Sequence, residues 1–239
     1  MPNSHILARP GAPAAADLDE LRGEIDRIDN ALLALMERRL ATAHAVAALK
    51  RDHASEWLNL RPNREAAVLD RLTDRAEAMP VETVRAIWRE LIALNLQAQR
   101  RMEVVVHAGS RPTLVASAAR ERFGGAAPIV VADTPEEALE RALTHEAVAV
   151  IELSPLSAWW IALTEIPGLS IFKALRDADG VIVALAVGRI APESLLPRER
   201  YLILAEETLA QRAAAGEAIR AIAMCGRLRL CLLDPEGGR

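Results

Sequence analysis

Several cations and amides at helical spacing are the residues of this sequence most able to do chemistry. Arg39 stands at a core position of an apolar stripe that repeats at steps of four and three, through Leu21, Ile25, Ile28, Leu32, Leu35, Thr42, Val46 and Leu49. A guanidinium keeps its proton in proteins and is costly to bury alone. An ion pair with another helix, a side chain that reaches out of the stripe, or a bound anion would each satisfy Arg39.

Three further residues can share a ligand with Arg39. Lys50 follows eleven positions later, which on a helix returns it to within roughly 20° of the same face, about 16 Å along the axis. A second apolar stripe, formed by Val84, Trp88 and Leu91, continues with Asn95, and Gln99 comes one turn later. Two cations and two amides at these spacings indicate a site for a small ligand.

Arg22 poses a geometric problem. It precedes Arg39 by seventeen positions, which on a straight helix places it about 25 Å away and rotated by roughly 100°. It cannot serve the same ligand from the same chain. A helix this long, with only two shorter partner helices, would leave much of its apolar face in water as a monomer. Antiparallel dimerisation would cover that face and bring Arg22 of one chain to the pocket of the other.

Composition bounds the alternatives. The chain has 239 residues, about half of them apolar, and a formal charge of -4, which suits one large or two modest domains and does not favour nucleic acid as a partner. Residues 1–16 lack the apolar core of a signal peptide, and no stretch reaches the roughly 20 residues that span a bilayer. We therefore expect a cytoplasmic protein with no membrane partner. Cys225 and Cys231 have no metal-ligand spacing, and no metal or cofactor is expected.

The character of the chain changes near Arg101. Residues 1–16 are expected to be a disordered leader, residues 17–102 a three-helix domain and residues 103–239 an α/β domain. The fold class predicted is therefore multidomain, an all-α domain followed by an α/β domain. The expected helices are 17–51, 62–78, 81–101, one after Pro112, one from Pro135, and 156–163. The expected strands are 104–107, 129–131, 148–152, 180–187, 201–204 and 227–233.

A family resemblance rests on an ordered set of residues over about 17–101. Leu21-Arg22, Ile25, Ile28-Asp29, Leu32-Leu33, Arg39, Lys50, Arg64-Glu65, Asn95 and Gln99 together resemble the all-helical class of bacterial chorismate mutases. The resemblance implies an intertwined homodimer that rearranges chorismate to prephenate in phenylalanine and tyrosine biosynthesis. It also implies that Arg39 and the partner subunit's Arg22 hold the two substrate carboxylates. Lys50 and Gln99 would bracket the ether oxygen, Glu65 would accept from the ring hydroxyl, Arg64 would add positive field, and Asn95 would contact a carboxylate.

Other functions remain open at this point. The same scaffold and the same spacing also support isochorismate pyruvate lyase, a relative that eliminates pyruvate. Arg61 stands where many relatives carry an aspartate, and Asn95 stands where a serine is common. A non-catalytic helical dimerisation module, carrying a ligand-binding α/β domain, is the alternative from a different class.

The role of residues 103–239 is less defined. The order of elements loosely resembles a truncated prephenate dehydratase domain, but the Thr-Arg-Phe motif of that activity is absent from these 239 residues, so we expect no dehydratase activity. Gly109-Ser110 fits an anion-binding turn or an ordinary connection. Trp159-Trp160 fits a ligand cleft or core packing. A small-molecule effector of this domain is possible, and so is a remnant that only buries surface.

Overall fold

The computed structural model describes residues 18–50, 57–144 and 146–233, so the expected leader lies outside the described residues. Residues up to Thr42 and residues from Ala43 onward form two compact units. The units therefore divide inside the first helix. The domain boundary expected at residue 102 stays a prediction.

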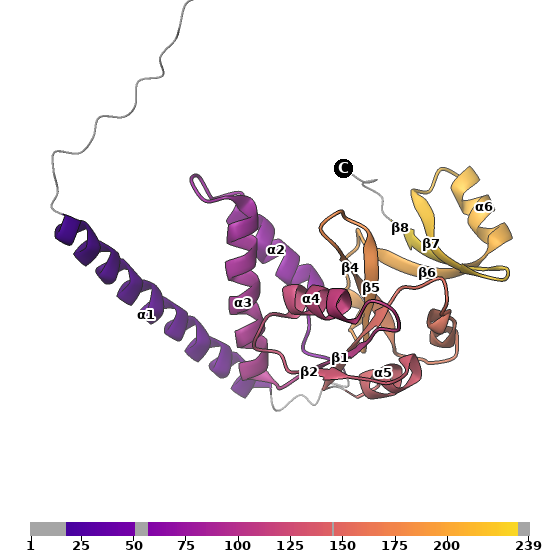
Figure 1. Ribbon diagram of the computed structural model, residues 1–239, viewed down its shortest axis with the longest axis horizontal. Coiled ribbons are helices and arrows are strands. Elements are labelled where there is room, and N and C mark those ends of the chain that lie inside the picture. The colour runs from indigo at the N-terminus through magenta and orange to yellow at the C-terminus, as the bar shows by residue number, and fades with distance from the viewer. Residues whose placement is uncertain (1–17, 51–56, 145, 234–239) are drawn as a thin grey trace, which may run out of the picture. The chain divides into compact units, whose positions relative to one another are not determined.

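The heptad stripe folds as expected into one long helix, α1 (Leu18–Lys50) (Figure 1). Its large apolar side chains are exposed, for example Ile25 at 57%, Leu32 at 47% and Leu35 at 57%. An isolated helix is marginally stable in water, and most helical stability comes from packing of the apolar face. No described helix combines the length and the apolar content needed to cross a membrane.

The next two helices form a hairpin. Pro62 begins α2 (Pro62–Thr73), where its fixed φ suits the first turn and its missing N–H is not needed. The helix ends at Thr73, five residues before the expected end at residue 78. The backbone N–H groups that follow bond to carbonyls only three residues earlier, from Arg75 to Leu72 and from Ala76 to Thr73, which ends the α-helical pattern. Pro80 then precedes α3 (Val81–Gln99) and accepts from the N–H of Val84.

Five strands form the central sheet in the order β2-β1-β3-β5-β4. The first three, β1 (Glu103–His107), β2 (Ile129–Val131) and β3 (Ala147–Glu152), run parallel to one another. Strand β5 (Ile182–Gly188) runs antiparallel to both of its neighbours, β3 and β4 (Ser170–Arg176). Helices α4 (Pro112–Phe123) and α5 (Pro135–Ala142) make the connections between the parallel strands. The chain leaves β1 toward β2 and then returns past β1 to β3. Right-handed connections in opposite directions place the two helices on opposite faces of the sheet.

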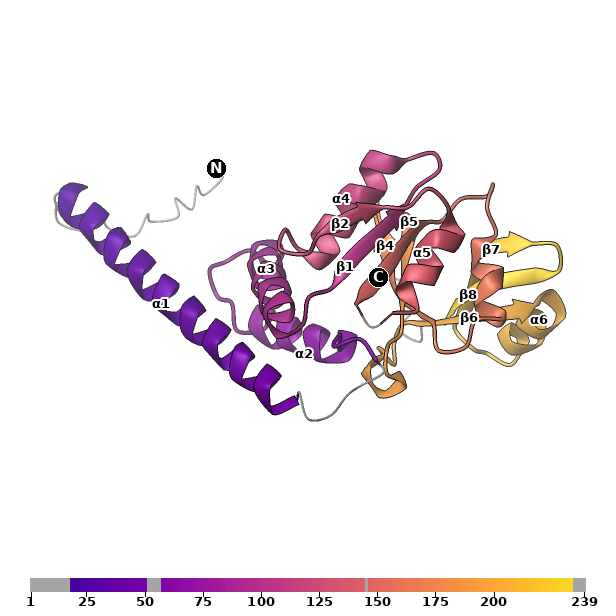
Figure 2. The same cartoon turned by 90° about the horizontal axis from the view of Figure 1, so that it is seen from below.

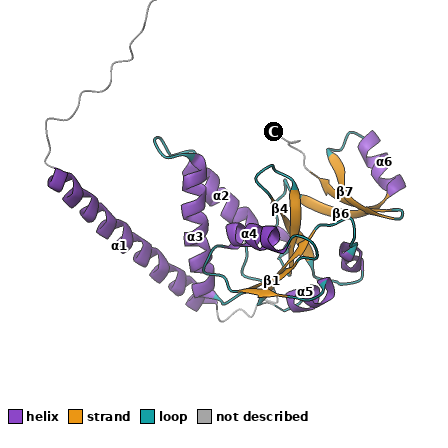
Figure 3. Ribbon diagram, in the orientation of Figure 1, coloured by secondary structure: helices purple, strands orange, loops and turns teal. Residues whose placement is uncertain are grey.

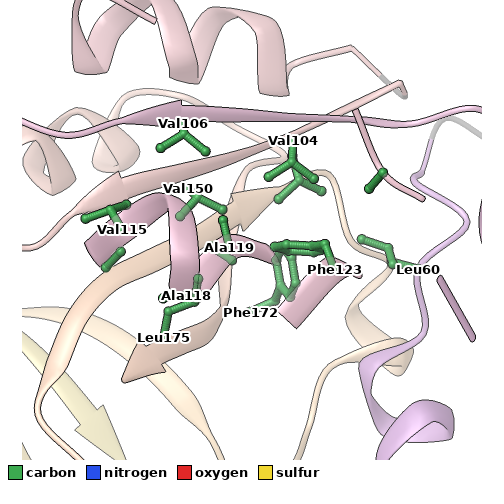
Figure 4. Close-up of a cluster of buried hydrophobic side chains, with 14 of the residues drawn as sticks. Leu60, Val104, Val106, Val115, Ala118, Ala119, Phe123, Val150, Phe172 and Leu175 are labelled. Carbon is green, nitrogen blue, oxygen red and sulfur yellow. The ribbon is translucent and has the colours of Figure 1, made fainter. Parts of the chain in front are cut away.

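The two faces carry separate cores. Alternate residues of the strands point to opposite faces, so Val104 and Val106 pack with α4 while Val105 packs with α5. Figure 4 shows the α4 side, where Val115, Ala118, Ala119 and Phe123 meet the sheet. The domain is therefore a sheet covered on both faces, as the pattern of buried strands predicted.

The link before α2 belongs to the core of the α/β domain. Leu58 and Leu60 are 5% and 2% exposed and pack in the same cluster as Phe123 and Phe172 (Figure 4). The N–H of Leu58 donates to the carbonyl of Arg189 at 2.8 Å. This packing explains why α2 and α3 form one compact unit with the α/β domain.

A second sheet completes the chain. It has three antiparallel strands in the order β6-β8-β7, namely β6 (Arg200–Ala205), β7 (Ile219–Cys225) and β8 (Leu228–Leu233), with α6 (Glu206–Ala214) between β6 and β7 (Figure 2). Helix α6 and strands β4 and β7 were not predicted from the sequence. The expected helix over 156–163 is a 3-10 helix, η1 (Trp159–Thr164), because a turn bridged by Ser154 and Ser157 precedes it. The predicted class, helices followed by an α/β domain, is confirmed (Figure 3).

Candidate active site in the helical segment

Three predicted cations lie on α1, and the two whose side chains are described have different surroundings. Arg22 is exposed and its Nη1 lies 3.2 Å from the Asp19 carboxylate one turn earlier. Arg39 is half-buried, and burial lowers the pKa of its guanidinium from the ordinary value of 12.5. Lys50 is the last residue of α1, and its side chain lies outside the described residues. Arg39 is therefore more buried than Arg22, as its position in the stripe predicted.

The predicted pair on α2 is split between solvent and the interior. Arg64 is exposed and its backbone N–H donates to the Asn63 side chain at 2.6 Å. Glu65 points inward, with a side chain only 13% exposed, and its Oε2 lies 2.8 Å from Nη2 of Arg122 on α4. The other oxygen of Glu65, Oε1, is buried and has no hydrogen-bond partner among the residues that the structure describes.

The predicted amides on α3 also point inward. Asn95 is 6% exposed and its Nδ2 donates to the backbone carbonyl of Leu91. Its Oδ1 is buried without a hydrogen-bond partner in the described part of the chain. Gln99 accepts a hydrogen bond from Asn59 Nδ2 at 2.9 Å through its Oε1. The amide nitrogen of Gln99 is the group that the resemblance assigns to the substrate, and this bond engages the oxygen of the amide instead.

A pocket of about 160 Å³ lies between α2, α3, α4 and β4. Its charged lining comes from Glu65, Asp70, Arg85, Arg89, Arg122 and Lys173, and its apolar lining includes Leu69, Ile92, Leu96 and Phe123. Neither Asn95 nor Gln99 lines it. At 100° per residue, Asn95 lies about 100° and Gln99 about 60° round α3 from the row of Arg85, Arg89 and Leu96. The structure therefore brings Glu65 to this pocket, and the convergence of all the predicted residues on one ligand stays a prediction.

Two contacts of the site, Asn59 with Gln99 and Arg122 with Glu65, were not predicted from the sequence. Asn59 lies forty residues from Gln99 in the chain, and Arg122 belongs to a helix of the other predicted domain. Both pairs depend on tertiary packing, and no local pattern marks either residue.

The α/β domain offers a second location, at the carboxyl ends of β1 and β3. In open α/β sheets ligands bind where neighbouring connections diverge, and here the chain leaves β1 and β3 for opposite sides. The turn at Ser110 does bind an anion, but the anion is the carboxylate of Glu152, which is 3% exposed. Ser110 donates to it from its backbone N–H at 2.8 Å and from its hydroxyl at 2.6 Å, and Arg111 Nε donates at 2.8 Å.

These hydrogen bonds set the ionisation of Glu152. Burial by itself raises the pKa of the carboxyl, but the bonds from the side chains and backbones of Ser110 and Arg111 outweigh it and lower the pKa to about 2. The chain's own carboxylate thus fills the position that the sequence left open for an external anion. Trp159 and Trp160 are 4% and 1% exposed, and Trp159 Nε1 donates to the Glu152 carbonyl. Core packing, one of the two expectations for this pair, is confirmed.

Comparison with known proteins places the class of the helical segment. Residues 21–100 match the family model described as chorismate mutase type II. This match confirms the resemblance inferred from Arg22, Arg39, Lys50 and the residues of α2 and α3. It covers the helices, whereas the α/β domain lies outside it.

Two curated relatives extend the similarity. A bifunctional chorismate mutase/prephenate dehydratase from Neisseria gonorrhoeae is 33% identical over 145 residues, covering 57% of this chain and 39% of the relative. A protein of the same description from Aquifex aeolicus is 30% identical over 113 residues, covering 45% of this chain and 30% of the relative. The chain thus spans less than half the length of the curated relatives that it matches. Both alignments are longer than the helical segment that matches the family model.

Proposed function

We propose that the helical segment rearranges chorismate to prephenate. One observation carries the proposal: the segment that matches chorismate mutase type II presents the expected residue types in the expected order on three successive helices. Those residues are Arg22, Arg39 and Lys50 on α1, Arg64 and Glu65 on α2, and Asn95 and Gln99 on α3. The names of both curated relatives support the same reaction.

The chemistry requires little from the protein beyond placement and charge. Chorismate carries two carboxylates, and its carbon–oxygen bond breaks as a new carbon–carbon bond forms in one concerted step. Negative charge builds on the ether oxygen in the transition state. Donors held in place before the reaction stabilise that charge without reorganising, and a pocket that folds the substrate's side arm over its ring supplies the orientation.

Each predicted residue has a role in this scheme. Arg39 and the partner subunit's Arg22 bind the carboxylates, for which the planar guanidinium is well shaped. Lys50 and Gln99 donate to the ether oxygen. Glu65 accepts from the ring hydroxyl through Oε1, while its other oxygen stays on Arg122. Asn95 contacts a carboxylate, and Arg64 contributes positive potential.

We propose further that two chains associate through α1. The exposed apolar side chains along this helix favour burial against another helix. The separation of Arg22 from Arg39 along one helix, about 25 Å, requires a second chain if both are to hold one substrate. A homodimer with shared sites satisfies both requirements.

The direct test is the loss of chorismate absorbance with purified protein. Lys50→Ala and Arg39→Ala should each lower kcat/KM by roughly a hundredfold or more, because each removes a preorganised donor. Arg38→Ala is the matched control, since Arg38 is an exposed neighbour on the same helix, and it should keep parental turnover. Parental turnover in Lys50→Ala and Arg39→Ala would reject the catalytic assignment.

The shared site has its own test. Arg22→Ala and Arg39→Ala should each be inactive alone and should regain part of the activity when mixed, because one of the two sites in a mixed dimer keeps both arginines. Exchange of subunits is verified by native mass spectrometry. Confirmed exchange without any recovery would refute the shared geometry.

Two alternative functions predict different results in assays of the same purified protein. An isochorismate pyruvate lyase would release pyruvate from isochorismate, which a coupled lactate dehydrogenase assay measures. A non-catalytic dimerisation module would turn over neither substrate, although it would still dimerise through α1. The match to chorismate mutase type II favours the mutase.

For the α/β domain we propose no dehydratase activity, since the Thr-Arg-Phe motif is absent from these 239 residues. Incubation with prephenate should therefore yield no phenylpyruvate. The possible effector remains a proposal as well. The pocket of about 160 Å³ that includes Lys173 of β4 is a place where one can bind, and titration with phenylalanine, tyrosine and prephenate tests it.

A further inference from the structure

We propose that Arg122 of the α/β domain is a positioning residue for the mutase site, holding the carboxylate of Glu65. The inference rests on the proposed function, in which Glu65 accepts from the substrate hydroxyl. It assigns the α/β domain a part in the chemistry of the helices, because a site residue of α2 takes its orientation from a side chain of α4.

The ion pair itself is the first argument. Arg122 Nη2 lies 2.8 Å from Glu65 Oε2, and the two side chains are only 18% and 13% exposed. An ion pair in such surroundings is screened less than one in water and restricts the rotamer of the carboxylate. One oxygen is engaged by Arg122, and the other is left buried without a partner among the described residues. That oxygen is the one able to accept from a ligand.

The second argument is that Arg122 is itself held in place. Its guanidinium carbon lies 5.0 Å from the centroid of the adjacent Phe123 ring, a distance typical of a cation–π contact. Phe123 packs edge to face on Phe172 of β4, with ring centroids 6.4 Å apart. Phe123 and Phe172 belong to the core of the sheet (Figure 4). Glu65 is therefore tied to that core through Arg122 and Phe123.

The third argument is the docking of α4 onto the helical hairpin. The N–H of Gly125, just after α4, donates to both carboxylate oxygens of Glu90 at 3.2 and 3.0 Å. Gly124 has φ of +75°, and a Cβ there would lie 2.6 Å from Cβ of Ala93. Such a close approach requires glycine. The end of α4 that carries Arg122 thus has a fixed place against α3.

A second ion pair across the same interface provides a matched control. Arg89 of α3 lies 3.5 Å from Glu121 of α4, and that carboxylate is 71% exposed. Glu121→Gln removes this ion pair from the same interface without touching Glu65 or the lining of the pocket. Exposed ion pairs of this kind contribute little to stability, about 0 to 1 kcal/mol. A general weakening of the interface would affect both variants, whereas loss of the positioning of Glu65 would affect only Arg122→Met.

The experiment measures kcat and KM for chorismate in the full chain, with urea unfolding alongside. Arg122→Met should lower kcat/KM by about tenfold or more, mainly through kcat, and Glu121→Gln should change it by less than about twofold. Arg122→Lys should recover part of the loss. In the Glu65→Gln background, Arg122→Met should cause no further loss of kcat/KM, because the group it positions is already gone.

Several results would overturn the proposal. Equal losses in Arg122→Met and Glu121→Gln, or additive losses of Arg122→Met with Glu65→Gln, would mean that Arg122 does not act through Glu65. If Arg122→Met alone fails to fold, the double variant with Glu65→Gln leaves no unpaired charge, and it must match Glu65→Gln in activity. A parent chain that does not turn over chorismate refutes the proposed function, whereas an active parent that is insensitive at residue 122 refutes only this inference.

Discussion

Replacing Glu152 by glutamine should destabilise the α/β domain strongly at neutral pH. The carboxylate binds four donors, with Oε1 taking the Ser110 hydroxyl and Arg111 Nε and Oε2 taking the backbone N–H groups of both residues. A glutamine side chain keeps the shape and offers one acceptor oxygen, so its amide N–H groups face donors on the other side. The change therefore removes a charge and leaves buried donors unpaired.

The magnitude follows from linkage. The carboxyl has an ordinary pKa of 4.5 and a folded pKa of about 2, and one unit corresponds to about 1.36 kcal/mol, so the carboxylate contributes about 3 kcal/mol at pH 7. The folded pKa is the lower one. The contribution is therefore fully present above pH 4.5 and is lost as pH falls toward 2. At pH 3 about 1.5 kcal/mol remains.

Urea unfolding followed by tryptophan fluorescence measures this effect, since Trp159 donates to the Glu152 carbonyl and reports on the same region. At pH 7 Glu152→Gln should lose about 3 kcal/mol relative to the parent, and the difference should shrink by half or more at pH 3. Glu165→Gln is the control, because Glu165 is exposed on a neighbouring turn, and it should change stability by less than about 0.5 kcal/mol. A difference below about 1 kcal/mol at pH 7, or one that does not depend on pH, would refute the reasoning.

Two further predictions concern packing and a second buried carboxylate. Gly124→Ala should cost about 2 kcal/mol or more of unfolding free energy, since the residue has positive φ and its Cβ would overlap Ala93. Gly180→Ala, which has φ of +79° and open space around it, should cost less in the same urea titration, and equal costs would deny the tight docking of α4 on α3. Lys173→Met should lower the free energy of unfolding by about 2 kcal/mol at pH 7. Burial by itself raises the pKa of the Glu199 carboxyl, but the Lys173 ammonium, 2.5 Å away, outweighs this effect and lowers that pKa. Without the lysine, Glu199 is destabilising when charged, so the loss should shrink as the carboxyl protonates toward pH 4, and a loss that does not change with pH would contradict this explanation.

The helical segment could be predicted well because its information is local. A heptad stripe fixes the length and face of α1, and Pro62 and Pro80 mark the starts of the next helices. Arg39, a charged residue at a core position of the stripe, marks this segment as a candidate site. The partners of those residues could not be predicted in the same way. Arg122 meets Glu65 only because α4 docks beside α2.

In the α/β domain, too, local elements could be predicted from the sequence, whereas contacts between distant residues could not. Short apolar runs predicted β1, β2 and β3 to within one residue. For β1 and β3 the reason is that strands buried on both faces read as continuous apolar sequence. Strand β7 was missed, since its burial is irregular and it lies at the edge of a small sheet. The bonds from Ser110 to Glu152 join residues forty-two positions apart, so the turn was recognised as a site for an anion without its occupant.

The packing of the link before α2 joins the helical hairpin to the core of the α/β domain. Leu58 and Leu60 fill the same core as Phe123 and Phe172, and a Cβ on Gly188 would lie 2.8 Å from Leu58. A fragment starting at residue 103 would lose both leucines, and burial of a leucine side chain contributes about 1.5 to 3 kcal/mol. The composition of the chain changes near Arg101 because helices give way to strands there, whereas the core continues across that point. The helical hairpin and the α/β domain therefore stabilise each other, which is the physical basis on which a residue of one can position a residue of the other.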